Sequence, residues 1–177
     1  WEIQGDGIER WEFSKDGKDL TLHVRKGVKF FDKPPANGRE VEARDVVYSL
    51  KSMTGQLYPD LPPVRFPRKS NLDAMVDAVA VDKYTVKIEF RATPFLTCVL
   101  DCGTGIVSKQ YYDQVGIDVA RRQTAGTGPY RLTRHALGSV MQLEAVDEYW
   151  RNVPQWKTVR LLNAPEDSTR LAMVITG

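Results

Sequence analysis

The sequence predicts a globular fold in which strand hairpins are combined with helices, and three observations carry this prediction. Residues 7–26 alternate apolar and polar side chains with a period of two, as strands do. From Ala43 the apolar residues recur with the spacing of an amphipathic helix. Residues 130–162 return to the alternation of strands, and an apolar run at 171–175 indicates a closing helix.

Two hairpins are predicted in the first half of the chain. The first turns at Lys15-Asp16-Gly17-Lys18, where Asp-Gly is a strong turn signal, and continues with Leu20, Leu22 and Val24. The second turns at Asp82-Lys83. Its apolar positions are Val76, Val79, Val81, Val86, Ile88 and Phe90.

An amphipathic helix is predicted from Ala43 to about Gly55. Its apolar residues fall at i, i+1, i+4 and i+7, namely Val46, Val47, Leu50 and Met53. A glycine suits the left-handed conformation that ends many helices. Residues 56–71 contain four prolines, so we expect no continuous element there.

Two shorter helices are predicted next. Pro94 opens the first, from Phe95 to Asp101, because proline suits the first turn of a helix. Ser108 caps the second, over residues 109–115, which stops at Gly116.

The last part of the chain is predicted to form three strands and a helix. Residues 117–124 are expected to be a polar connection, and Gly126-Thr127-Gly128-Pro129 a tight turn. The closing helix is expected to have Asp167 or Ser168 as its cap. The strands are predicted at residues 130–134, 140–145 and 158–162.

The composition is that of an ordinary globular protein, with 42% apolar and 27% charged residues. It excludes collagen-like, disordered and disulfide-scaffold classes. No run approaches the roughly 20 apolar residues that a membrane-spanning helix needs. The net charge of +2 is too small to predict nucleic acid or an anionic membrane as a partner.

The sequence offers no arrangement typical of catalysis. His23 and His135 have no partner at a recognisable spacing, and the acidic pairs fall at expected turns and helix starts. Gly103-Thr104-Gly105 and Gly126-Thr127-Gly128 lack the Lys-Ser/Thr of a phosphate-binding loop, so turns explain them better. We therefore expect no enzyme, no cofactor and no metal site.

Cys98 and Cys102 lie four positions apart in a segment that has the pattern of a helix. Helical i,i+4 positions seldom have the geometry of a disulfide, and a free cysteine commonly packs as a small apolar residue. Packing is therefore the favoured interpretation, with a strained disulfide or a metal site as alternatives. Neither histidine is near enough in sequence to support a zinc site.

Aromatic residues in loops are the candidate binding groups. Trp150 and Trp156 are expected to pack against a neighbouring strand, whereas packing and ligand binding remain equally open for Tyr58. A basic cluster at Arg65, Arg68 and Lys69 is interpreted as a solvated loop.

Several segments together resemble family 5 of the extracellular solute-binding proteins, which serve ABC importers of peptides, nickel and related solutes. Their order and spacing follow the family across nearly the whole chain. They are Leu22-His23-Val24-Arg25-Lys26-Gly27-Val28-Lys29-Phe30 with Asp32, Ala43-Arg44-Asp45-Val46-Val47-Tyr48-Ser49-Leu50, Asp82-Lys83-Tyr84-Thr85-Val86, Gly126-Thr127-Gly128-Pro129-Tyr130, Asp147-Glu148-Tyr149-Trp150 and Asp167-Ser168-Thr169-Arg170. Glu42 departs from the family's usual Thr or Ser cap, and Phe31 from its usual His.

The resemblance implies an α+β fold of the periplasmic-binding-protein kind, type II, with the accessory domain of the peptide-binding class. Residues 1–116 would be that accessory domain and residues 117–177 part of the first lobe. The opposing lobe would be absent, and both ends of the chain look cut, so we expect a piece of a longer protein.

The resemblance also implies a function. We expect the extracytoplasmic, monomeric solute-binding component of an ABC importer, which captures a peptide or similar small solute and delivers it to a membrane permease. The alternative is a ligand-sensing domain of a regulator or chemoreceptor. No cofactor and no nucleic acid are expected. By their places in the family's pattern, the expected ligand contacts are Tyr58, Asp101, Cys102, Gly103 and Thr104.

Overall fold

The computed structural model describes residues 4–60, 69–93, 105–120, 123 and 125–176. The chain divides into two compact units, Trp1–Thr127 (unit 1) and Gly128–Gly177 (unit 2). The expected helix from Phe95 to Asp101 lies outside the described residues, and so do both cysteines.

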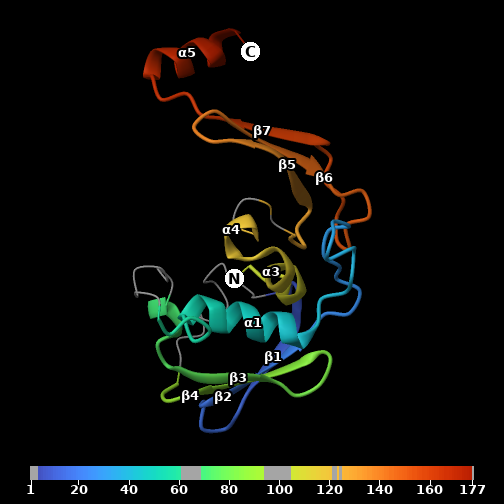
Figure 1. Cartoon of the computed structure of the whole chain (residues 1–177), viewed down its shortest axis with the longest axis vertical. Helices are drawn as coiled ribbons and strands as arrows, with labels where there is room; N and C mark the ends of the chain where they lie inside the picture. Colours follow the sequence, from blue (N-terminus) through green and yellow to red (C-terminus); the bar gives the residue numbers. More distant parts are fainter. Residues whose placement is uncertain (1–3, 61–68, 94–104, 121–122, 124, 177) are drawn as a thin grey trace. The chain divides into compact units, whose positions relative to one another are not determined.

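Unit 1 is built on a four-stranded antiparallel sheet (Figure 1). Its strands are β1 (Ile8–Phe13), β2 (Asp19–Val24), β3 (Met75–Ala80) and β4 (Thr85–Phe90), in the order β1-β2-β4-β3. Both predicted hairpins are confirmed, and β2 pairs with β4 at the centre with Leu20 opposite Ile88. The two central strands alternate buried and more exposed residues, as expected of a sheet with one covered face.

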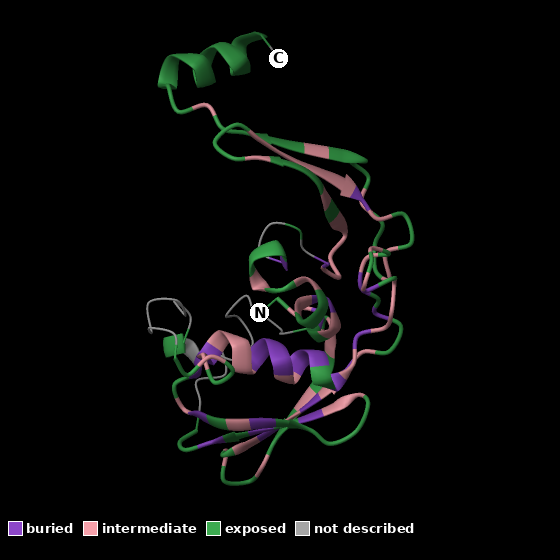
Figure 2. Cartoon of the chain, in the orientation of Figure 1, coloured by how far each residue is buried: buried purple, intermediate pink, exposed green. Residues whose placement is uncertain are grey.

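Helix α1 (Ala43–Thr54) covers that face of the sheet, and most of its length is buried (Figure 2). It ends as predicted at Gly55, whose φ of 78° is left-handed. Leu20, Val86 and Ile88 are fully buried beneath the layer of helices. Burial of these side chains is the main stabilising contribution to unit 1.

The valines that indicated β3 in the sequence point away from the core. Val76 and Val79 are each 46% exposed, whereas Met75 and Ala78 are buried. A register shift between Met75 and Asp77 causes this change, because an extra residue in the strand reverses which side chains face inward.

Two short helices follow residues 94–104, which lie outside the described part of the chain. Helix α3 (Lys109–Val115) is capped by the Ser108 hydroxyl and ends at Gly116, as predicted. Helix α4 (Ile117–Ala120) occupies part of the region expected to be a polar connection, so that expectation was wrong. Ala120 is fully buried and its amide donates to the Gly116 carbonyl, which shows that packing stabilises a turn of helix there. The 3-10 helix η2 (Lys69–Leu72) precedes β3.

The segment at Gly126 packs against the loop that follows Phe30. The Phe31 amide donates to the Gly126 carbonyl, and a side chain at Gly126 would lie 3.3 Å from the Phe31 ring. The backbone bends at Gly128 and Pro129 and makes no tight turn over Gly126–Pro129, contrary to the prediction. Close approach to Phe31 explains the glycine at 126.

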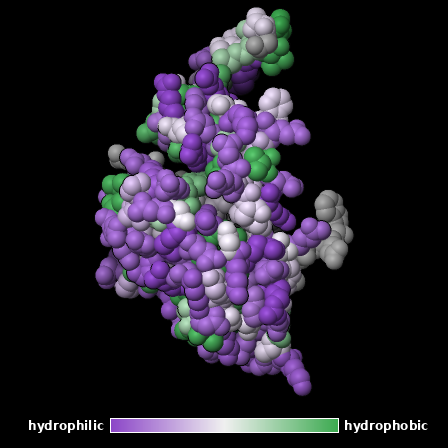
Figure 3. Space-filling view, turned by 90° about the vertical axis from the view of Figure 1, so that its right-hand side faces the viewer, coloured by the Kyte–Doolittle hydropathy of each residue, from purple (hydrophilic) through white to green (hydrophobic). Residues whose placement is uncertain are grey.

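Unit 2 contains a three-stranded antiparallel sheet and a helix. The predicted strands are confirmed as β5 (Tyr130–Ala136), β6 (Val140–Ala145) and β7 (Thr158–Leu162), in the order β5-β6-β7. Helix α5 (Asp167–Thr176) begins at Asp167 and buries none of its residues. Its hydrophobic end is visible at the top of Figure 3.

The aromatic residues of unit 2 divide into two environments. Trp150 is partly buried between Tyr149, with ring centres 5.6 Å apart, and the guanidinium of Arg151. Trp156 is 76% exposed, so its expected packing against a strand is wrong. Its carbonyl instead accepts a hydrogen bond from the Tyr130 hydroxyl.

Within the described residues, no helix combines the length and the apolar content that crossing a membrane would require.

Candidate functional site

A buried ion pair joins the start of α1 to the loop before it. The Asp45 carboxylate is completely buried and accepts hydrogen bonds from both terminal nitrogens of Arg39, at 2.8 and 2.5 Å. The guanidinium also lies 4.9 Å from the centre of the Phe30 ring. Asp45 raises the pKa of Arg39 above its ordinary value by accepting these bonds, and burial opposes the rise.

The same carboxylate caps α1. The Glu42 amide donates to Asp45 Oδ2 at 3.0 Å, which is one half of a capping box. The other oxygen, Oδ1, accepts from the Lys109 amide at 3.1 Å. Asp45 therefore contributes to the capping box at the start of α1, together with Glu42, and it fixes α3 to α1.

Two serines complete this network. Ser49 donates to the Asp45 carbonyl at 2.7 Å and accepts from the Val107 amide at 2.9 Å. Ser108, fully buried, accepts from Arg39 at 3.0 Å and from the Tyr111 amide at 3.2 Å. The segment leading into α3 is therefore held on α1 by buried hydrogen bonds, which favours a single arrangement of the two helices.

Next to the network, Tyr48 of α1 lies close to Tyr58, which follows α1, and to Tyr112 of α3. The hydroxyl groups of Tyr48 and Tyr58 lie 3.2 Å apart. The Tyr48 ring centre is 5.8 Å from that of Tyr112 and 5.8 Å from the Lys109 ammonium group. The position of Tyr58 is therefore fixed by two contacts. Its amide donates to the carbonyl of Gly55 at the end of α1, and its hydroxyl contacts the hydroxyl of the buried Tyr48.

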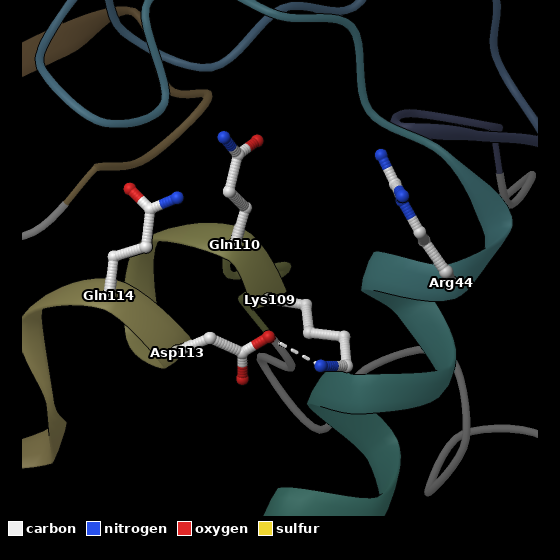
Figure 4. A pocket seen from close by; sticks show the side chains of 5 residues that line it. All are labelled: Arg44, Lys109, Gln110, Asp113 and Gln114. Atoms are coloured by element: carbon white, nitrogen blue, oxygen red, sulfur yellow. Dashed lines mark hydrogen bonds and ion pairs between the residues drawn. The ribbon is translucent and has the colours of Figure 1, made fainter.

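A polar pocket of about 370 Å³ opens between α1 and α3 (Figure 4). Arg44 extends from α1, and Lys109, Gln110, Asp113 and Gln114 come from α3. Lys109 and Asp113 form an ion pair at 2.5 Å, and Arg44 pairs with Glu42 at 2.8 Å. The pocket offers amide and charged groups suited to a polar ligand, without a nucleophile paired to a base.

The structure places only one of the five predicted site residues. Tyr58 lies beside Tyr48, and Asp101, Cys102, Gly103 and Thr104 lie outside the described residues. Sequence reasoning missed Tyr48, Lys109 and Asp113. The i,i+4 spacing of the last two on a helix could have indicated their ion pair, but nothing local distinguishes Tyr48 from a core residue.

In the described part of the chain, no three or more His, Cys, Asp or Glu side chains gather in a way that could hold a metal ion.

A family model places this chain among known proteins. The model for the middle part of the bacterial extracellular solute-binding proteins of family 5 matches residues 2–177. The chain belongs to this family. The resemblance expected from the sequence motifs is therefore confirmed.

Curated relatives give the same result. The chain is 31% identical to the dipeptide-binding protein of Escherichia coli, over 93% of this chain and 33% of that protein. It is 27% identical to heme-binding protein A of Haemophilus influenzae, over 99% of this chain and 34% of that protein. The chain thus spans about a third of the length of these relatives.

Solved structures confirm the fold class. A periplasmic binding protein associated with an ABC transporter of Helicobacter pylori, in complex with a peptide, matches with a TM-score of 0.85 at 24% identity, over 99% of this chain and 37% of that one. The nickel-histidine complex of NikZ from Campylobacter jejuni matches with a TM-score of 0.81 at 19% identity, over 97% of this chain and 33% of that one. The fold is that of type II periplasmic binding proteins, represented by part of its length.

The phenol of Tyr48 gives the site a measurable pH dependence. Burial raises the pKa of Tyr48 above its ordinary value, and the hydrogen bond to Tyr58 adds to the rise. The unfolded chain ionises this phenol from about pH 10, whereas the folded chain keeps it protonated. Its contribution to stability is therefore complete below about pH 10 and decreases as the pH rises further.

We expect the free energy of unfolding, measured in urea, to fall less steeply above about pH 10 in Tyr48→Phe than in the wild type. An equally steep fall in both proteins would contradict the role of Tyr48.

Proposed function

We propose that the complete protein is the solute-binding component of an ABC importer. It captures a peptide or similar small solute between two lobes and delivers it to a membrane permease. The observation that carries the proposal is the family match over residues 2–177, together with 31% identity to a dipeptide-binding protein. The sensing alternative has no support among the names of the relatives.

Peptides are the favoured solute class. Several relatives are named for binding dipeptides or tripeptides, including proteins of Pseudomonas aeruginosa that are 28–29% identical to this chain. The polar pocket and the paired phenols offer donors and acceptors of the kind that recognise amide and carboxylate groups. We propose a protein without catalytic activity or cofactor that works as a monomer. We also propose that it works outside the cytoplasm, which the word extracellular in the family's description supports.

Within the complete protein, we assign residues 1–116 to the accessory domain and residues 117–177 to part of the first lobe. Tyr58 and the segment Asp101–Thr104 would face the solute. Binding would shift the population from open to closed lobes, and the closed form would dock on the permease. Both lobes contribute to such a site, so the 177-residue chain alone should bind the solute weakly.

The proposal is tested on the complete protein, including the lobe that this chain does not contain. A thermal-shift screen would compare a dipeptide pool, heme, nickel with histidine, and oligosaccharides. We expect the dipeptide pool to raise the melting temperature, because a ligand of the native state stabilises it by mass action. If no solute class raises the melting temperature, the importer proposal is overturned.

The role of Tyr58 is tested with two matched substitutions. In Tyr58→Phe we expect the dissociation constant for a bound dipeptide to increase about fivefold, the effect of one lost hydrogen bond. Tyr130→Phe removes a phenol bonded to the Trp156 carbonyl and is the control, expected to leave affinity unchanged. If calorimetry gives the two variants the same affinity for the dipeptide, Tyr58 does not contact the solute.

A further inference from the structure

The sheet of unit 2 has one face that carries arginines in adjacent rows. Arg134 on β5, Gln142 on β6 and Arg160 on β7 are paired across the strands and form one row, called here the arginine row. Arg131 and Glu144 belong to the next row on the same face.

A β-bulge creates this face. The register of β5 shifts between Leu132 and Arg134, so one extra residue is accommodated at Thr133. In a regular strand, residues three apart point to opposite faces. Because of the bulge, Arg131 and Arg134 lie on the same face instead.

The opposite face is mostly apolar, with His135 paired to Met141 as a polar member. The side chains that share it in the register include Leu132, Met141, Leu143, Val159 and Leu161. An apolar face of this kind is typical of the side of a sheet that packs on other elements. The face with the arginines carries the charged and polar side chains that are typical of a surface exposed to water.

The charges on the arginine face are not balanced within the described residues. The Glu144 carboxylate lies 3.6 Å from the Arg131 guanidinium and balances its charge. Arg134 and Arg160 are exposed, and neither has an ion pair or a side-chain hydrogen bond to another described residue. Since neighbouring strands are about 4.8 Å apart, their Cα atoms lie about 10 Å from each other on either side of Gln142.

We propose that this face is a docking surface for an acidic protein segment, whose carboxylates pair with Arg134 and Arg160. Charge complementarity supports an acidic partner, because two like charges held in one row are relieved by opposite charges. An open sheet face does not enclose a small molecule, whereas it suits an extended segment or a helix. Arginine also binds carboxylates through two parallel hydrogen bonds.

The neighbouring row adds an apolar element to the surface. Ala136, Val140 and Leu162 are paired on the same face beside the arginine row, and Leu162 is 58% exposed. The partner segment therefore combines acidic side chains with an apolar one. This inference is independent of the solute that the complete protein binds.

The test uses the 177-residue chain and a fluorescent peptide of sequence EELEEL, with KKLKKL as the peptide control. Binding is measured by fluorescence polarisation at low and at high salt. We expect the chain to bind EELEEL in preference to KKLKKL, and high salt to weaken binding. Arg134→Gln with Arg160→Gln should weaken it about tenfold, the product of two losses of about threefold.

Two further variants make the result specific. Lys15→Gln with Arg91→Gln removes the same charge from exposed positions of unit 1 and should leave affinity within about twofold of the wild type. Arg134→Glu with Arg160→Glu should reverse the preference towards KKLKKL. The proposal is overturned if the two glutamine pairs weaken binding equally, or if inorganic phosphate at equal charge displaces EELEEL.

Discussion

Asp45→Asn is expected to lower the free energy of unfolding by about 3 kcal/mol. The substitution preserves the shape of the side chain and removes its charge, so Arg39 is left as a largely buried cation without a counterion. The Arg39 side chain is 17% exposed and the Asp45 side chain is not exposed at all. The same change weakens the bonds that Asp45 accepts from the amides of Glu42 and Lys109, which cap α1 and attach α3.

Urea unfolding followed by circular dichroism measures this loss. Asp113→Asn is the matched control, because the ion pair of Asp113 with Lys109 is about half exposed and should contribute under about 1 kcal/mol. Adding Arg39→Met to Asp45→Asn should restore part of the stability, since the unpaired charge is then absent. Equal losses in the two single variants would show that the buried pair does not stabilise the α1–α3 arrangement.

The two units are expected to differ completely when each is produced alone. Residues 1–127 should unfold cooperatively, whereas residues 128–177 should show no cooperative transition. Among the described hydrophobic residues, Ala145 is the only buried one in unit 2. A unit of this size without a core cannot offset the conformational entropy of folding.

Thermal melts of the two separate pieces, followed by circular dichroism, check this expectation. The exposed residues of β7 and α5, visible in Figure 2, supply the physical reason, because Leu161 and Leu171 are 54% and 61% exposed. A sharp melting transition in the isolated unit 2 would show that these residues pack in a way that the structure does not contain.

The elements of the fold were largely predictable because they depend on local periodicity. The alternation around Leu20 and Leu22 and the helical spacing from Ala43 each follow from which side chains face the core, and the structure confirms them. Local chemistry also sufficed for Ser108 and Gly116 at the ends of α3. The prediction was wrong at α4, where packing of Ala120 outweighs the polar sequence around it.

The candidate site was predicted less well, because its contacts join distant parts of the chain. The hydrogen bond from Arg39 to Ser108 spans 69 positions, and the one from Lys109 to Asp45 spans 64. Nothing near Asp45 in the sequence indicates that its carboxylate is buried. Tyr58 was singled out as an aromatic residue in a loop, but its neighbour Tyr48 was not, since only the fold brings the two hydroxyls to 3.2 Å.

The sequence by itself determined the strands, the main helices and the family, since periodicity and ordered motifs are properties of the linear chain. Only the tertiary structure decided which charges are buried together and which face of a strand each side chain occupies. The bulge in β5 is an example, because a single extra residue places Arg131 and Arg134 on one face. Long-range pairing fixes such details, and no local pattern contains it.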